Sequence, residues 1–544
     1  MPSLLEQDFF DLPKTKRSIH ELAETESLVL FLGSGLSASQ GLPVWYQLLR
    51  RLLDKAAAEH PDLNGEEAKE EFVQTLLKTT EPTILGSIVR GLYPAPEAFV
   101  DALSTAIYSE SLRLGGPRSA SNFTQAVWEL IFTRRQRKKK TVIITTNYDD
   151  VLESALTNDV DVRSLGQSLG IAYAIPIHGE HQFLAHRDTA LDEEHAVVVH
   201  HIHGYLPADA TERVDAGNIV LSARDYGQSW EAHWSYELLS PHWRDDWLFI
   251  GMSFHDPHIT FFLRARNEHL GDEKDRVNED NPPRGVFSLQ GQPWASLSES
   301  AKLGLARAEV SRLRELGMKA LPTLYFFQDA QFLREIALRA ESGDKYQPYV
   351  ARRTQWAWEF SSERLSSEEG ERAKGLLQDV HRTLLEVRAR VEDIAPHEDE
   401  RFKIELWCRD PDDRCLFQLG SSESVSGEPD RARRYALSSD LPIAAVQALT
   451  AGAATTSTVP LSAASRWQYY FGFPISLSGQ PWYELPVGAL VIAGTAPETS
   501  SALHTQRATL EARIEEWAAG VVKYLDPRSE WKAGLGSRIA RLLP

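Results

Sequence analysis

The part of the chain with the clearest chemical potential is a glycine- and serine-rich turn, Gly33-Ser34-Gly35-Leu36-Ser37, which directly follows the apolar run 28–32. A buried strand that enters a helix through such a turn can bind phosphate, because glycines let backbone N–H groups approach an anion. Ser37 could cap the helix or donate its hydroxyl to a ligand. Ala38 stands where a dinucleotide fingerprint has its third glycine, and no Walker lysine follows, so a plain strand–helix turn stays open as an alternative.

Polar residues follow three further apolar runs. They are Asn147 and Asp149 after the run 141–144, His203 after 196–202, and Gly251 and Ser253 after 246–250. Open α/β sheets bind ligands at the carboxyl ends of their strands, so we expect these residues to converge. Taken alone, Asn147 and Asp149 could also form a turn with a helix cap.

Other histidines compete with His203 for a functional role. His178-Gly179 forms a second His-Gly pair, but it lies in an irregular stretch, whereas His203 ends a clear strand, so we favour His203. His201 shares a strand face with His203, which could suit a metal. No acidic or thiol partner stands at ligand spacing, so we expect no metal ion. His258 is interpreted as a helix-start residue.

The composition is that of a multi-domain globular protein. At 544 residues, two or three domains are expected. With 58 basic and 77 acidic residues, the net charge of −19 repels nucleic acid, and the basic run 134–140 is interpreted as a solvated loop. Two cysteines, Cys408 and Cys415, give no disulfide framework, which fits a reducing cytoplasm. We find no signal peptide and no apolar run of the ~20 residues that span a bilayer, so we expect a cytoplasmic protein without membrane contact.

Strands alternate with helices over residues 15–345, which predicts an α/β fold with a Rossmann-like, doubly wound parallel sheet. The expected strands are 28–32, 141–144, 196–202, 218–221, 246–250, 285–289 and 319–327. The pattern from about 61 to 140 is helical throughout, so we expect a helical insertion there instead of a sheet layer.

The remainder of the chain differs in kind. Residues 346–398 are interpreted as a polar linker and a connector helix, whose apolar seam covers 369–394. Residues 399–526 predict an α+β module of the size of a sensor or oligomerisation domain. Its expected elements are strands 402–409, 414–419, 469–477 and 487–494 and helices 443–451 and 501–524.

Four segments together resemble the sirtuin (silent information regulator) family, in the family's order. They are Gly33-Ser34-Gly35-Leu36-Ser37 with Gly41-Leu42-Pro43, Thr145-Thr146-Asn147-Tyr148-Asp149, His203-Gly204, and Gly251-Met252-Ser253. The sequence departs from the family's deacylases in two ways. Val44-Trp45-Tyr46 replaces their acidic, aromatic and arginine residues, and their four-cysteine zinc module is missing, because no cysteine precedes Cys408.

A branch of the family is closer. The Thr-Thr-Asn-Tyr-Asp segment and the form Gly251-x-Ser253-x-x-Asp256-Pro257 resemble bacterial sirtuin-like effectors of anti-phage defence, which hydrolyse NAD instead of deacylating proteins. The C-terminal module resembles a GAF-type domain in its topology and in its strands 471–475 and 488–493.

The resemblance assigns roles to the site residues, with NAD as the substrate. Asn147 would place a water and the ribose hydroxyls, His203 would accept a proton as a general base, and Asp149 would engage the carboxamide. The remaining contacts would come from Gly33, Ser34, Gly35 and Ser37 to the pyrophosphate, from Pro43 in the same cofactor-binding loop, and from Gly251 and Ser253 to the adenosine side.

The implied activity is that of an NAD+ glycohydrolase, which cleaves NAD+ to nicotinamide and ADP-ribose when a trigger arrives. A trigger ligand or phage-derived protein would act through the C-terminal module, and we expect a homo-oligomer. Two alternatives stay open: an NAD-dependent protein deacylase, and a non-catalytic sensor of NAD or ADP-ribose.

Overall fold

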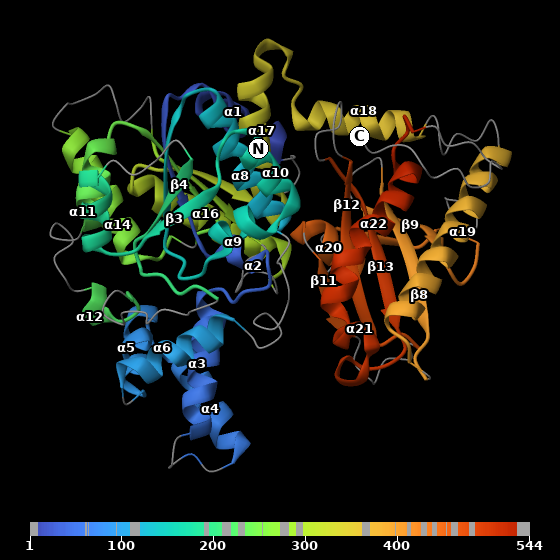
Figure 1. Cartoon of the computed structure of the whole chain (residues 1–544), viewed down its shortest axis with the longest axis horizontal. Coiled ribbons are helices and arrows are strands. Elements are labelled where there is room, and N and C mark those ends of the chain that lie inside the picture. The colour runs from blue at the N-terminus through green and yellow to red at the C-terminus, as the bar shows by residue number, and fades with distance from the viewer. Residues whose placement is uncertain are drawn as a thin grey trace. The chain divides into compact units, whose positions relative to one another are not determined.

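Figure 1 shows a computed structural model of the chain. The chain folds into two compact units, Met1–Tyr346 and Gln347–Pro544. The structure describes residues 9–59, 63, 65–93, 95–108, 120–189, 195–208, 219–226, 234–252, 254–271, 282–289, 297–361, 370–397, 399–410, 415–425, 432–437, 443–452, 454–458, 466–477 and 485–529. Within these ranges, no helix combines the length and the apolar character that a bilayer crossing requires.

A parallel sheet of seven strands forms the centre of the first unit, in the order β3-β4-β2-β1-β5-β6-β7. The strands are β1 (Ser27–Leu32), β2 (Lys140–Thr145), β3 (Tyr173–Ile177), β4 (Ala196–His201), β5 (Asp246–Ile250), β6 (Arg284–Ser288) and β7 (Lys319–Thr323). β1 pairs with both β2 and β5, so it lies inside the sheet, and its residues Leu28 to Leu32 are fully buried. The chain leaves β1 towards β2 and leaves β5 towards β6. The carboxyl ends of β1 and β5 therefore mark the switch point, where such sheets bind ligands.

Helices cover the sheet in layers. α17 (Phe326–Ser342) packs against both α1 (Pro13–Glu24) and α8 (Asn122–Gln136), and α8 and α17 also contact strands. A core cluster joins Val29 and Phe31 of β1 to α14 (Pro257–Gly271) and α16 (Glu299–Glu315). The other helices of this unit are α2 (Ser34–Ala38), α3 (Trp45–Glu59), α4 (Glu66–Thr79), α5 (Pro82–Gly91), α6 (Pro96–Ile107), α9 (Val151–Asn158), α10 (Val160–Ser168), α11 (Glu180–Thr189), α12 (Ala223–Tyr226) and α13 (Trp234–Leu239).

The helical insertion is smaller than the sequence predicts. α4, α5 and α6 each pack against α3, and Figure 1 shows these four helices as a group beside the sheet layers. α8 was expected to belong to this insertion, but it packs against β2 and α17. A helical pattern shows which face of a helix is buried, but it does not show which element packs against that face. The sequence therefore could not place α8 on the sheet.

Three strand predictions need correction. β3 was taken for an irregular stretch; it is an edge strand, the kind of strand in which a proline such as Pro176 is tolerated. Residues 219–221 are not a strand, because the N–H group of Leu221 donates to the Asp225 carboxylate at 3.0 Å; Asn218 lies outside the described residues. The strand expected at 319–327 ends at Thr323, and α17 follows.

The second unit contains an antiparallel sheet of six strands, in the order β10-β9-β8-β13-β12-β11. The strands are β8 (Phe402–Arg409), β9 (Cys415–Ser421), β10 (Arg434–Ala436), β11 (Thr455–Thr458), β12 (Tyr469–Leu477) and β13 (Leu485–Gly494). The helices are α18 (Tyr349–Phe360), α19 (Gly370–Ile394), α20 (Ala444–Ala451), α21 (Ala502–Thr505) and α22 (Arg507–Leu525).

α19, which the sequence suggested as a connector, packs along β8, β9 and α22. A Cβ on Gly420 of β9 would lie 2.3 Å from Val380 Cγ1, so this glycine allows the helix to approach the sheet closely. The apolar seam of α19 is therefore part of the core of the second unit.

Arg134 corrects the interpretation of the basic run as a solvated loop. Its side chain is buried, and its guanidinium donates to the carbonyls of Thr25, Glu26 and Lys140 and to the hydroxyl of Thr141. Burial lowers the pKa of Arg134 to about 10, so the group is still charged at neutral pH. The arginine thus joins the end of α1 to the start of β2.

We expect Arg134→Met to destabilise the first unit by about 3 kcal/mol, because several buried carbonyls lose a charged donor. Urea unfolding followed by tryptophan fluorescence would measure the loss. Arg137→Met changes an exposed arginine at the end of the same helix and should alter the free energy of unfolding by less than about 0.5 kcal/mol. Equal midpoints for the two variants would contradict the prediction.

Candidate active site

The loops that follow β1 and β5 lie in direct contact at the switch point. The N–H group of Gly33 donates to the carbonyl of Ile250 at 3.1 Å, and that of Gly35 donates to the carbonyl of Gly251 at 2.8 Å. A Cβ on Gly35 would lie 2.9 Å from the Cα of Gly251, and Gly251 has a φ of +70°. The glycines therefore allow two backbones to pack against each other where side chains would not fit.

This packing changes what the glycine turn can do. Because the N–H groups of Gly33 and Gly35 already donate to the protein, a pyrophosphate could use them only after the two loops separate. The segment with Pro43 folds back onto the turn, since the N–H group of Leu42 donates to the carbonyl of Ser37 at 3.1 Å and Pro43 is buried. In this structure the N–H groups of Gly33 and Gly35 are therefore not accessible to a phosphate.

Asn147, which follows β2, is held by four hydrogen bonds. Its Nδ2 donates to the carbonyl of Gly33 at 3.0 Å and to the Ser37 hydroxyl at 2.8 Å. Its N–H group donates to Thr145 Oγ1 at 3.0 Å, and its carbonyl accepts from His201 Nδ1 at 2.9 Å. Since both amide hydrogens are used inside the protein, Oδ1 is the atom that this side chain can offer to a ligand.

His201 and Glu153 form a buried pair behind Asn147. His201 Nδ1 donates to the carbonyl of Asn147, and its Nε2 donates to Glu153 Oε1 at 2.9 Å. Burial by itself would lower the pKa of His201, but the Glu153 carboxylate and the two hydrogen bonds outweigh burial and raise it. Because both partners accept, the ring carries both protons and holds the backbone of Asn147 in place.

Asp149 is a buried carboxyl group beside this network. Burial raises its pKa to about 6, although hydrogen bonds from the Ser37 hydroxyl and the N–H group of Val151 act in the opposite direction. The group therefore changes its charge close to neutral pH, next to the hydroxyl that also binds Asn147.

The raised pKa of Asp149 predicts that the stability of wild type depends on pH and that Asp149→Asn removes this dependence. Between about pH 4 and 7 the Asp149 carboxyl group ionises more readily in the unfolded chain than in the folded protein. The free energy of unfolding of wild type should therefore fall by about 3 kcal/mol relative to that of the variant. Urea unfolding of both proteins across this range measures the difference, because their other carboxyl groups are shared. Asp161→Asn, at an exposed carboxylate, should give no such trend. A pH-independent difference for Asp149→Asn would contradict the prediction.

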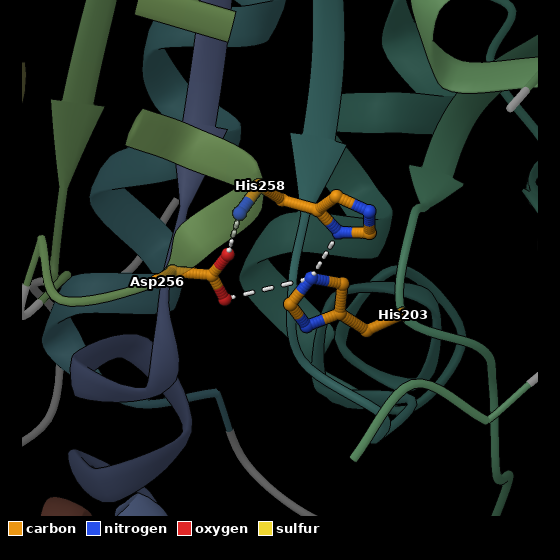
Figure 2. Close-up of side chains that lie close together, drawn as sticks. All are labelled: His203, Asp256 and His258. Carbon is orange, nitrogen blue, oxygen red and sulfur yellow. Dashed lines mark hydrogen bonds and ion pairs between the residues drawn. The ribbon is translucent and has the colours of Figure 1, made fainter. Parts of the chain in front are cut away.

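His203 follows β4 and lies in a second cluster, shown in Figure 2. Its Nε2 is 2.8 Å from Nδ1 of His258 and 3.5 Å from Oδ2 of Asp256. Burial lowers the pKa of His203, and the Asp256 carboxylate offsets this only in part. The ring is therefore neutral at pH 7, as a proton acceptor must be.

Two hydrogen bonds through Val220 connect the loop of Asn147 with that of His203. The hydroxyl of Tyr148 donates to the carbonyl of Val220 at 2.6 Å, and the N–H group of Val220 donates to the carbonyl of His203 at 3.0 Å. The competing histidine, His178, follows the edge strand β3 and stacks on Tyr205. Its neighbours thus differ from those of His203.

The structure brings part of the predicted site together. Ser37, Asn147 and Asp149 share one hydrogen-bond network with Gly33, and Gly35 and Gly251 touch beside it. Ser34 is half-buried in the same turn, and Ser253 lies outside the described residues. Four residues were missed as site components: Glu153, His201, Asp256 and His258. The last two follow β5, and the strand-end rule that selected His203 could have found them.

Residues 141–301 match the family model described as a SIR2-like domain. The matched segment contains Asn147, Asp149, His203 and Gly251 and begins after the glycine turn. A comparison with curated proteins found no match. SIR2-like domains are generally NAD-utilising enzymes. The match and the seven-stranded parallel sheet together support a sirtuin-like fold for this part of the chain.

Proposed function

We propose that the first unit hydrolyses NAD+ to nicotinamide and ADP-ribose. The observation that carries the proposal is the fixed amide of Asn147, whose Oδ1 remains to bind a water or a ribose hydroxyl. Water would attack the ribose carbon, the bond to nicotinamide would break with its electron pair passing to the ring, and His203 would accept the proton of the water. The buried, neutral state of His203 supports this role.

The donor set suits a nucleotide that carries ribose hydroxyls and an amide. Ser37 and Asp149 lie within the network of Asn147, and the ionised Asp149 could accept from the carboxamide. Ser34, Gly251 and Ser253 are proposed to bind the phosphates and the adenosine once the glycine turn and the β5–α14 loop separate.

Deacylation is disfavoured by the cysteine content. The zinc module of family deacylases needs four cysteines, and this chain has two, Cys408 and Cys415, both in the second unit. We therefore propose hydrolysis of NAD+, with transfer to an acetylated lysine as the alternative that the experiment must exclude.

The second unit is proposed as a GAF-like sensor or oligomerisation module that receives a trigger. Its α+β content supports a module of this kind. The resemblance to anti-phage effectors suggests that the trigger accompanies phage infection and that NAD depletion is the output.

The test is to incubate the purified full chain with NAD+, with and without candidate triggers, and to measure nicotinamide and ADP-ribose by chromatography. We expect both products in equal amounts. An acetylated peptide is added in parallel, and acetyl-ADP-ribose would indicate deacylation instead. A protein that binds ADP-ribose but releases no nicotinamide under any trigger, including extracts of phage-infected cells, would be a sensor.

A further inference from the structure

Three side chains at the ends of β4 and β5 converge in a way that proton acceptance alone does not require. His203 Nε2, His258 Nδ1 and one Asp256 oxygen all lie within 4.8 Å of one another. His203 and His258 are buried, and Asp256 is partly buried. In Figure 2 both rings and the carboxylate point towards a common centre. The two histidines are 55 residues apart in the sequence, and their rings meet because each follows a strand of the same sheet.

Two imidazoles and a carboxylate are a known ligand set for zinc, with the fourth position left open. Zinc–nitrogen bonds of about 2.0–2.1 Å in tetrahedral geometry place two nitrogens roughly 3.3 Å apart. His203 Nε2 lies 2.8 Å from His258 Nδ1 and 3.5 Å from Asp256 Oδ2. A small rotation of one ring would therefore admit the ion.

The carboxylate is oriented by further contacts, as metal ligands usually are. Asp256 Oδ1 accepts from the N–H group of His258 at 2.8 Å, and Oδ2 accepts from the hydroxyl of Tyr226 at 3.3 Å. By contrast, the two ring nitrogens of His201 donate to a carbonyl and a carboxylate, which leaves that ring no lone pair for a metal. The cluster of His203, Asp256 and His258 could therefore bind a metal ion, whereas His201 could not.

We propose that His203, Asp256 and His258 bind one Zn2+ ion. Imidazole ligands favour zinc over Mg2+ and Ca2+, which prefer oxygen. The ion takes a lone pair from His203, so the zinc-bound protein cannot use this ring to accept a proton. Zinc binding and the proposed hydrolysis therefore exclude each other; this consequence, unlike the site itself, rests on the proposed function.

The binding test uses the full chain without a histidine tag, stripped of metal by a chelator. Titration with Co2+, followed by visible absorption, and competition of Zn2+ with a chromophoric chelator report the site directly. We expect one equivalent to bind, and His258→Gln and Asp256→Asn each to weaken binding by more than about tenfold. The matched control is His255→Gln, at an exposed histidine beside Asp256, which should bind as wild type does.

Circular dichroism would first confirm that each variant is folded. An affinity that is unchanged in both ligand variants, or the absence of a stoichiometric site in wild type, would overturn the proposal. In the NAD+ assay, one equivalent of Zn2+ should suppress nicotinamide release and a chelator should restore it. Continued turnover by zinc-loaded protein would overturn the mutual exclusion, whereas no turnover in either state would count against the proposed hydrolysis and leave the binding result standing.

Discussion

Replacing Asn147 with alanine is expected to slow nicotinamide release by about 10²–10³-fold, comparable to the loss of one preorganised polar group in other enzymes. The variant loses the Oδ1 atom that would orient the water, and it also loses the bonds from Nδ2 to Gly33 and Ser37. Nicotinamide release at saturating NAD+ measures the change. Circular dichroism and urea unfolding, measured in parallel, show whether the variant keeps its fold.

Two further variants sharpen this prediction. Asn147→Asp keeps the oxygen but places a second oxygen against the carbonyl of Gly33, so we expect no rescue. Asn158→Ala removes a partly exposed amide from the end of α9 and should react like wild type. Wild-type rates in Asn147→Ala would remove this residue from the site.

His203→Ala should reduce the rate by about 10²–10⁴-fold, the usual loss when a general base is removed. Wild type should lose activity in acid as the His203 ring protonates, at a pH below the usual one for histidine because burial lowers its pKa. Since Asp149, with a pKa of about 6, would add an acid limb of its own, His203 and His203→Ala are compared in an Asp149→Asn background, where the alanine variant should lack the remaining limb. A pH profile of nicotinamide release from both proteins therefore separates a proton-accepting role from a merely structural one.

The control for His203 is His178→Ala, the other histidine in a His-Gly pair. His178 follows the edge strand β3 and stacks on Tyr205, so its removal should leave the rate close to that of wild type. A larger loss in His178→Ala than in His203→Ala would mean that the wrong pair was chosen from the sequence.

The elements found from the sequence are those whose burial leaves a simple pattern. β1, β2 and β5 lie in the interior of the sheet and read as apolar runs. β3 was missed because an edge strand has an exposed side, on which Tyr173 is 46% exposed. Residues 219–221 were mistaken for a strand because they are apolar and buried, whereas the Asp225 carboxylate, which accepts from the N–H groups of Leu221 and Ser222, leaves no periodic signal.

Site residues that directly follow a strand could be predicted from the sequence. Contacts between residues that are distant in the sequence could not. Asn147 and His203 follow this rule. The contact of His201 with the carbonyl of Asn147 is invisible in the sequence, because every residue has a carbonyl. The closed contact of Gly35 with Gly251 could not be foreseen either, since a glycine allows both anion binding and close packing.

The interlocked loops after β1 and β5 have a consequence for ligand affinity. If the two hydrogen bonds between them contribute roughly 1 kcal/mol each, the separated form makes up only about 3% of the molecules. A dinucleotide that needs the separated form would then bind about 30-fold more weakly than its contacts allow. Any event that holds the loops apart would recover this factor. The affinity for NAD+ would then rise about 30-fold without any new contact between protein and ligand.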